Sequence, residues 1–303
     1  APSTLGPSRL LSSEKLEEWK LLPHHPNWAQ LFPKHWVPGA QGAQKALKLF
    51  IKNLAHYHTQ RDIPSAKTSH LSPYLHFGEI GLETIRSHLE HAEAPKKDKD
   101  KFLSELLWRE FSTHFFYHFP ELPRQNFNKA FDRFSWKNNT HLFKAWSKGN
   151  TGYPLIDAGM RELWHTGWMH NRVRMVVASF LVKDLLIDWR KGAKWFEDTL
   201  LDADRASNSF NWQWVAGCGA DAAPYFRIFN PVTQSQTHDP KGIYIRTWVP
   251  ELAKLPDKYI HAPWKAPEAM LKEAGITLGT TYPHPIVDHD KARALALGVY
   301  KDL

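Results

Sequence analysis

The sequence predicts an all-α fold. Apolar residues recur every three or four positions through most of the chain, which is the spacing of one helix face. Strict alternation of β-branched and polar residues is nearly absent, and residues 242–249 are the best strand candidate. With 303 residues, of which 42% are hydrophobic, the chain is long enough to bury a sizeable core. We expect a helical domain at 39–262, a lead-in segment at 1–38 and a surface-packed tail at 263–303.

The first helices follow from the apolar spacing and from end signals. An apolar stripe that includes Leu47 and Phe50 predicts a helix from residue 41 onward. Ser72 and Pro73 are typical of an N-cap and a first helical position, and Gly78 ends this short helix. The charged residues 91–101 are expected to form a solvated loop.

The remaining helices are longer. The strongest pattern predicts a helix over 100–119 with its apolar side buried, namely Leu103, Leu106, Leu107, Phe111 and Phe115. Further helices are expected at 141–148, 154–166, 171–188, 194–201 and 208–217, and Trp189 is expected to end the one at 171–188.

Bulk properties narrow the class of protein. The net charge of +8 and the pI near 9.4 favour a polyanionic partner. A single cysteine, Cys218, excludes an intrachain disulfide and a cysteine-based zinc site, and fits a reducing compartment. The i, i+4 pair His114 and His118 could hold a metal, but an exposed helix face is the favoured interpretation, so no metal is expected.

The sequence also predicts the subcellular location of the protein. It contains no apolar run of the roughly 18 residues that a membrane span needs, and the first residues do not form a secretory signal. We therefore expect a cytoplasmic protein without a membrane partner. The chain does not begin with Met, which indicates a fragment or a processed chain.

Two helices carry polar side chains on one face. Glu105, Trp108 and Arg109 share a face that could hydrogen-bond a base edge, stack on it and hold a phosphate. Asn171, Arg174 and Met175 have the same spacing. On spacing alone, an exposed ion-pair face and a capped core helix explain the two sets better.

The segment 202–214 holds two acids, an asparagine and two tryptophans. The acids suit the N-terminal dipole of the helix that follows them. Asp204, Asn208 and Trp212 form one column along this helix, whereas Trp214 points to nearly the opposite side. Two tryptophans that face different environments can have separate roles.

Six motifs occur together in one family. They are Thr-Ser-His-Leu-Ser-Pro-Tyr-Leu-His-Phe-Gly (68–78), Glu-Leu-Leu-Trp-Arg-Glu-Phe (105–111), and the segments 151–161, 168–175, 202–214 and 223–231. In their order and spacing the chain resembles the helical FAD-binding domain of the cryptochrome/DNA photolyase family. Within it, the chain is most similar to bacterial-type (class I) cyclobutane pyrimidine dimer photolyases.

The resemblance implies a function and its partners. FAD would lie folded at the centre of the helical domain and act in its anionic reduced form, giving an electron to a pyrimidine dimer in DNA under light. The alternative is a cryptochrome-like photoreceptor with little or no repair. Family members carry a preceding α/β domain that holds an antenna chromophore; this chain lacks it, so no antenna is expected here. A monomer, associated with the nucleoid when bound to DNA, is also implied.

The resemblance assigns residues to each role. Arg174 would pair with Asp202, Asn208 would face the flavin N5, and Phe102 stands where relatives often have tryptophan. The implied cofactor-binding residues are Tyr57, Thr68, Ser69, His70, Leu71, Ser72, Phe102, Arg174, Asp202, Ala203, Asp204 and Asn208.

Two further sets are implied. Glu105 would hydrogen-bond the pyrimidine dimer. Asn171 stands where the (6-4) photolyases have a histidine, which argues against the (6-4) lesion as the substrate. The DNA-binding set is Arg61, Glu105, Trp108, Arg109, Asn171, Arg172, Met175, Trp214 and Gln234. Trp212, Trp189 and Trp146 would form an electron-transfer chain from the flavin to the surface.

Overall fold

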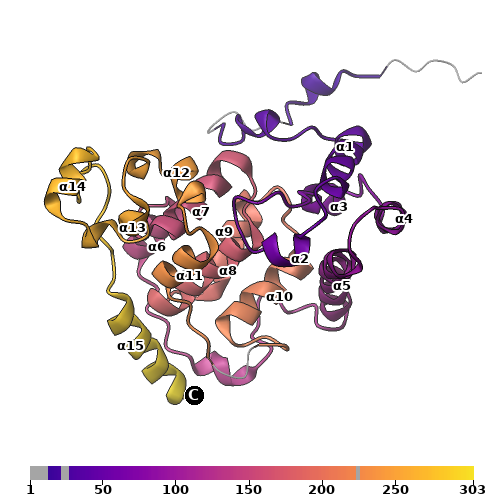
Figure 1. Cartoon of the computed structure of the whole chain (residues 1–303). Coiled ribbons are helices and arrows are strands. Elements are labelled where there is room, and N and C mark those ends of the chain that lie inside the picture. Colours follow the sequence, from indigo (N-terminus) through magenta and orange to yellow (C-terminus); the bar gives the residue numbers. More distant parts are fainter. Residues whose placement is uncertain (1–12, 22–26, 223–225) are drawn as a thin grey trace, which may run out of the picture.

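The all-α prediction is confirmed. The computed structural model describes residues 13–21, 27–222 and 226–303, and within these ranges it contains helices, one isolated bridge between Leu278 and Tyr282, and no strand. Figure 1 shows two groups of helices that follow one another along the chain.

The first group surrounds an apolar core of its own. It contains α1 (Ala40–Ile51), α2 (Tyr57–Gln60), α3 (Ser72–His76), α4 (Leu82–Glu90) and α5 (Lys96–His118). Buried residues from these helices, including Leu47, Phe50, Ile85 and Phe102, form one cluster. In Figure 1 these are the indigo and violet elements.

The second group is larger. Its core includes Ile156, Val177, Phe180 and Trp189. Its helices are α6 (Thr140–Ser147), α7 (Pro154–Thr166), α8 (Asn171–Ser179), α9 (Trp189–Thr199), α10 (Arg205–Ala216), α11 (Pro231–His238), α12 (Ile243–Trp248), α13 (Asp257–Ile260), α14 (Glu268–Glu273) and α15 (His289–Lys301).

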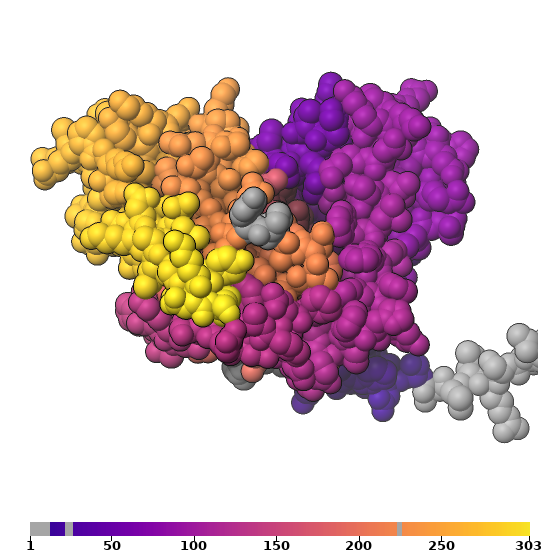
Figure 2. Space-filling view, turned by 90° about the horizontal axis from the view of Figure 1, so that it is seen from below, coloured from indigo at the N-terminus to yellow at the C-terminus, as the bar shows by residue number. Residues whose placement is uncertain are grey.

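The two apolar cores remain separate clusters, and polar side chains connect them. Trp168 Nε1 donates to Ser72 Oγ at 3.2 Å, and the Arg172 guanidinium lies 2.7 Å from the Asp62 carboxylate. Figure 2 shows a hollow where the violet and orange elements meet. Polar contacts and a hollow therefore occur together where the two groups of helices meet.

Three local predictions were wrong, each for a physical reason. Residues 242–249 form α12 because the Asp239 carboxylate accepts from the backbone N–H groups of Tyr244 and Ile245, which satisfies the first turn. The charged stretch 91–101 is only partly a loop, since α5 already begins at Lys96. The helix expected over 171–188 passes into a π-helical turn at Phe180–Asp184, so Trp189 begins α9 instead of ending α8.

The buried side of α5 was also predicted wrongly. Leu106 is buried as predicted, but Leu103, Leu107 and Phe111 are exposed, and the buried Phe102 was not in the predicted set. Phe111 and Phe115 nevertheless contact Phe210 of α10, so α5 meets the second group through aromatic rings as well as through the polar contact of Ser112 with Ser207.

The C-terminal segment enters the second core. Tyr282 is 1% exposed and its hydroxyl donates to Asp157 Oδ2 at 2.6 Å, and His289 contacts the buried Asp184 at 2.5 Å. The segment therefore packs more deeply than the expected surface layer, while the domain boundaries themselves stay predictions. None of the described helices combines the length and the apolar character that crossing a bilayer requires.

Candidate functional site

The loop before α3 lies at the boundary between the two cores. His70 has a φ of 50°, a left-handed conformation that side chains other than glycine rarely adopt. Its ring lies 4.2 Å from the Trp168 ring. Ser72 is the first helical residue and not the N-cap, and its hydroxyl accepts from Trp168 instead of capping α3. Strain at this loop is typical of a functional site.

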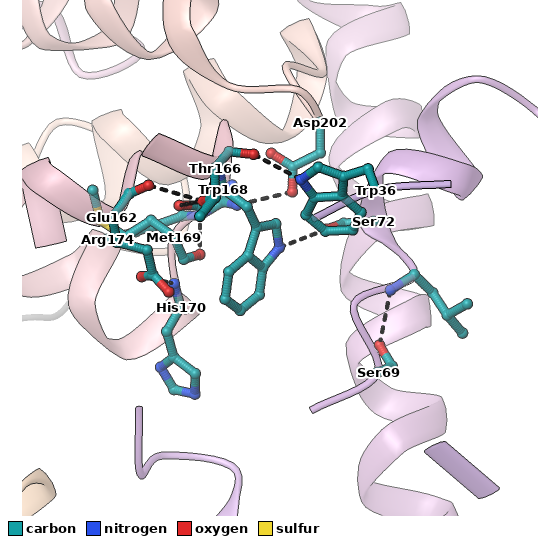
Figure 3. Close-up of polar contacts among 11 residues, drawn as sticks. Trp36, Ser69, Ser72, Glu162, Thr166, Trp168, Met169, His170, Arg174 and Asp202 are labelled. Carbon is teal, nitrogen blue, oxygen red and sulfur yellow. Dashed lines mark hydrogen bonds and ion pairs between the residues drawn. The ribbon is translucent and has the colours of Figure 1, made fainter. Parts of the chain in front are cut away.

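An ion pair faces this loop from the second group. The Arg174 guanidinium donates to Asp202 Oδ2 at 2.8 Å and to Met169 O at 2.7 Å, as predicted for the Arg174–Asp202 pair. The Asp202 side chain is 3% exposed, so the charge of its carboxylate needs this partner. Figure 3 shows this pair together with the contact between Trp168 and Ser72.

Helix α10 presents the predicted column. Asp204 is the N-cap, and its Oδ1 accepts from Ser207 N at 2.7 Å. Asn208 Nδ2 donates to Ala193 O at 2.9 Å, which turns the amide oxygen the other way. Trp212 is 2% exposed whereas Trp214 is half-buried, so the two tryptophans occupy different environments as predicted.

Two cationic side chains form ion pairs with Glu105 on one face of α5. Glu105 lies 2.8 Å from the Arg61 guanidinium and 3.0 Å from Lys101 Nζ. Trp108 is 49% exposed on the same helix, and Arg109 reaches Leu75 O. This face combines an oriented carboxylate with an accessible aromatic ring.

The other predicted DNA contacts come from α8 and α11. Arg172 pairs with Asp62 of the first group, and Asn171 Nδ2 lies 3.9 Å from Met175 Sδ on the exposed side of α8. Gln234 on α11 is half-buried. Ala203, between the two acids, packs against the second core.

Tyr57 and Phe102 belong to the first core. Their rings are 5.5 Å apart and perpendicular, and Phe102 also lies 4.5 Å from Phe50. Burial raises the pKa of Tyr57 to about 12, so its hydroxyl stays a hydrogen-bond donor at neutral pH.

Several buried polar atoms without a protein partner belong to the predicted binding residues. Buried polar groups in proteins almost always have a partner, so each exception needs an explanation. Among the described residues seven side-chain atoms are buried without one, and five of these belong to residues predicted to bind cofactor or DNA. These five are Arg61 Nε, Thr68 Oγ1, Arg172 Nε, Asp202 Oδ1 and Gln234 Oε1; the other two are His170 Nε2 and Asp184 Oδ2.

The tryptophan chain needs a correction. Trp146 was expected at the surface end of the electron-transfer chain, but it is fully buried and lies 6.3 Å from Trp212, so it cannot be that end. Trp189 is fully buried as well. Trp136, which the sequence reasoning missed, is half-buried; its polar neighbours Ser135, Lys137 and Asn138 were the available signal.

Sequence reasoning also missed Glu162. It is 7% exposed on α7 and accepts from the Tyr244 hydroxyl at 2.5 Å and from His170 N at 3.3 Å. Burial raises its pKa to about 7. It lines a cavity of about 260 Å³ together with Trp36, His70 and other residues. An acid on an otherwise buried helix face was the signal that could have identified it.

Two expectations concern other segments. Residues 223–225 of the motif 223–231 lie outside the described residues. The rings of His114 and His118 lie 4.7 Å apart in an edge-to-face arrangement, but in the described ranges no three His, Cys, Asp or Glu side chains form a group that could hold a metal ion.

Comparisons with known proteins agree with this geometry. Residues 102–302 match the model of the FAD binding domain of DNA photolyase. A deoxyribodipyrimidine photo-lyase of Agrobacterium fabrum is 54% identical over 98% of this chain, which spans 63% of that relative. Cryptochrome-2 of Arabidopsis thaliana is 44% identical over 88% of the chain, which spans 45% of that relative.

A solved structure gives the same result. The crystal structure of a class III photolyase from Agrobacterium tumefaciens superposes with a TM-score of 0.94 at 54% identity. The match covers 98% of this chain and 62% of the chain of that photolyase. This relative is a class III protein, whereas the motifs had suggested class I. From its match to the family model and its two helical groups, the chain belongs to the family of DNA photolyase FAD-binding domains.

Proposed function

We propose that this chain binds FAD between its two helical groups and serves the light-driven repair of cyclobutane pyrimidine dimers in DNA. The observation that carries the proposal is the set of partnerless buried polar atoms that belong to the predicted binding residues. Reduced FAD, when bound and excited by light, supplies the electron that opens the cyclobutane ring. Everything else in the reaction is positioning, electrostatics and exclusion of water by the protein.

The residues at the boundary fit such a cofactor. Thr68 Oγ1 and the hydroxyl of Ser69 would hold phosphate and ribityl oxygens, because both lie in the loop before α3. Asp202 Oδ1 is left to accept from the cofactor, since Oδ2 is engaged by Arg174. Asn208 would offer its amide oxygen near the flavin N5. A neutral amide there adds no negative charge, which favours an anionic reduced flavin.

The DNA lesion would enter from the side of α5. Flipping a dimer out of the duplex costs a few kcal/mol, less for a lesion whose pairing is already weakened. Trp108 and Trp214 would wall its pocket, and Glu105 would hydrogen-bond it, oriented by Arg61. The net charge of +8 would hold the flanking phosphates.

Trp212 would be the first electron donor to light-excited oxidised cofactor. Gly192, one turn after Trp189, lies directly against the Trp212 ring, so α9 brings Trp189 close to it. Because Trp146 is buried, the half-buried Trp136 is the better surface end on this side; its neighbour Lys137 donates from its backbone to Leu186 O, just before α9.

Trp146 would lead in another direction. Phe143 lies 5.7 Å from it and 6.3 Å from Trp195, and Trp195 stacks on the exposed Trp164 at 6.2 Å. This row of rings supports a second route from Trp212 to solvent.

A photoreceptor is the second candidate, because plant cryptochromes are 44% identical to this chain. It would bind FAD by the same residues and would not repair the dimer. The absence of an antenna chromophore from this chain, the monomeric state and the nucleoid association remain predictions.

The cofactor site can be tested with Thr68→Val. Because Thr68 Oγ1 has no protein partner, this change should leave the unfolding free energy of the FAD-free protein unchanged or raised. It should weaken FAD binding by about 1–3 kcal/mol, the cost of one lost buried hydrogen bond. Equilibrium titration with FAD measures this, with the exposed Thr84→Val on α4 as control. Equal FAD affinity in all three proteins would refute the assignment.

A further inference from the structure

Trp189 donates its indole hydrogen to an amide. Trp189 is fully buried, and its Nε1 lies 2.8 Å from Asn126 Oδ1. Asn126 is 1% exposed, and its Nδ2 donates to Asp132 Oδ1 at 2.7 Å. Because the carboxylate engages the amide nitrogen, the amide oxygen is fixed toward the indole.

The order of these three groups decides where a proton can go. An amide oxygen accepts a hydrogen bond but is a very weak base, whereas a carboxylate takes up a proton readily. The carboxylate of Asp132 is separated from the indole by the whole amide group of Asn126. The Trp189 N–H therefore points at a group that orients it and cannot deprotonate it.

A second charge acts on the same ring. The Arg190 guanidinium lies 5.1 Å from the centroid of the Trp189 ring, while it donates to Asp188 Oδ2 and to Arg124 O, both at 2.7 Å. A cation over the ring stabilises neutral indole and disfavours positive charge on it. The Arg190 guanidinium therefore opposes positive charge on Trp189.

We propose that Asn126 is a positioning residue that keeps the Nε1 proton on Trp189 while Trp189 carries the positive charge of electron transfer. The inference rests on the proposed electron path. In this step Trp189 gives one electron to oxidised Trp212 and becomes a cation radical with its N–H intact. One electron from Trp136, or from a thiol reductant in solution, then restores Trp189 without any proton movement.

A neutral radical would behave differently. If a base took the Nε1 proton, restoring Trp189 would need an electron and a proton together. The positive charge would then stay trapped inside the protein. An amide acceptor makes Trp189 a relay, because only the electron has to move.

A purely structural role for Asn126 is the competing explanation. Asn126 lies in a loop that Gln213 stabilises. Gln213 accepts a hydrogen bond from Phe127 N and donates to Leu122 O and Gln125 O. Loss of Asn126 alone could therefore disturb the loop. A test needs a variant that keeps both hydrogen bonds and changes only the basicity of the acceptor.

Exchanging the acid and the amide provides that variant. In the double variant Asn126→Asp with Asp132→Asn, the new carboxylate accepts from Trp189 Nε1 and from the new amide, so the hydrogen-bond pattern is retained. Transient absorption of the FAD-loaded protein after a light pulse distinguishes cation from neutral tryptophan radicals. We expect the exchange to replace the cation spectrum by the neutral one and to prolong the radical. Asp132→Asn alone should keep the cation spectrum.

The additional change Trp189→Phe in the exchanged protein tests whether Trp189 is the ring involved. It should abolish the difference in radical spectrum between the exchanged and the original protein. An unchanged radical spectrum in the exchanged protein would overturn the inference, and so would the same change in Asp132→Asn alone. Absence of any light-induced radical in the original protein would instead count against the proposed function.

The hydrogen bond itself can be tested without cofactor. In the FAD-free protein, the indole ¹⁵N–¹H signal of Trp189 should be protected from hydrogen exchange, and Asn126→Ala should lose that protection. Rapid exchange in the original protein would refute the geometry on which the inference depends.

Discussion

Replacing Glu162 by glutamine should change how the stability of the FAD-free protein depends on pH. The carboxyl has an ordinary pKa of 4.5 in the unfolded chain, and burial raises it to about 7 in the folded protein. Between these values the folded protein keeps a proton that the unfolded chain has released. The free energy of unfolding therefore falls as pH rises through this window, and the loss is complete above the folded pKa.

The magnitude follows from the shift. A difference of about 2.5 pKa units corresponds to about 3 kcal/mol, present at pH 4.5 and lost by pH 8. The glutamine side chain of the Glu162→Gln variant cannot ionise, yet its amide oxygen can still accept from Tyr244 and from His170 N. The variant should therefore gain stability relative to the original protein as pH rises.

Urea unfolding at several pH values measures this difference. His170 and Lys183, whose pKa values burial lowers, titrate in both proteins and cancel in the comparison. Glu93→Gln, an exposed acid, is the matched control and should show a constant difference. Parallel stability curves for Glu162→Gln and the original protein would show that Glu162 is not a buried acid with a raised pKa.

Three further predictions concern the site. Trp212→Phe should abolish light-driven reduction of oxidised FAD but leave repair by chemically reduced protein intact; equal loss of both activities would contradict separate roles. Trp214→Ala should weaken binding of a dimer-containing oligonucleotide by about 1–3 kcal/mol, the worth of one stacked base, as measured by fluorescence anisotropy; unchanged affinity would exclude it as a pocket wall. Asp202→Ala leaves the Arg174 guanidinium without its carboxylate partner and should cost about 3–5 kcal/mol of unfolding free energy in denaturant titration; a change below about 1 kcal/mol would contradict the buried pair.

Helical periodicity predicted the fold class well because most helices here have one apolar face. The element at 154–166 was predicted at its observed ends, since Pro154 suits a first helical position and Gly167, with φ of 69°, suits a C-cap. Periodicity failed to predict the secondary structure where a hydrogen bond to a side chain outside the element determines it. Asp239 makes α12 helical in spite of its β-branched residues.

The candidate site was predictable to a similar degree. The pair of Arg174 with Asp202 and the divergence of Trp212 and Trp214 are properties of motifs and helix geometry. The burial of Trp146 was not predictable, because it depends on how α6 packs against α7 and on a hydrogen bond from its Nε1 to Val177 O at 3.0 Å.

Recovery of thymine from a dimer-containing single-stranded oligonucleotide tests the central claim most directly. The FAD-loaded chain is reduced chemically, mixed with the oligonucleotide, and divided between blue light and darkness. We expect intact thymine only in the illuminated sample. A flavin spectrum without thymine recovery in light would contradict a repair function and favour the photoreceptor.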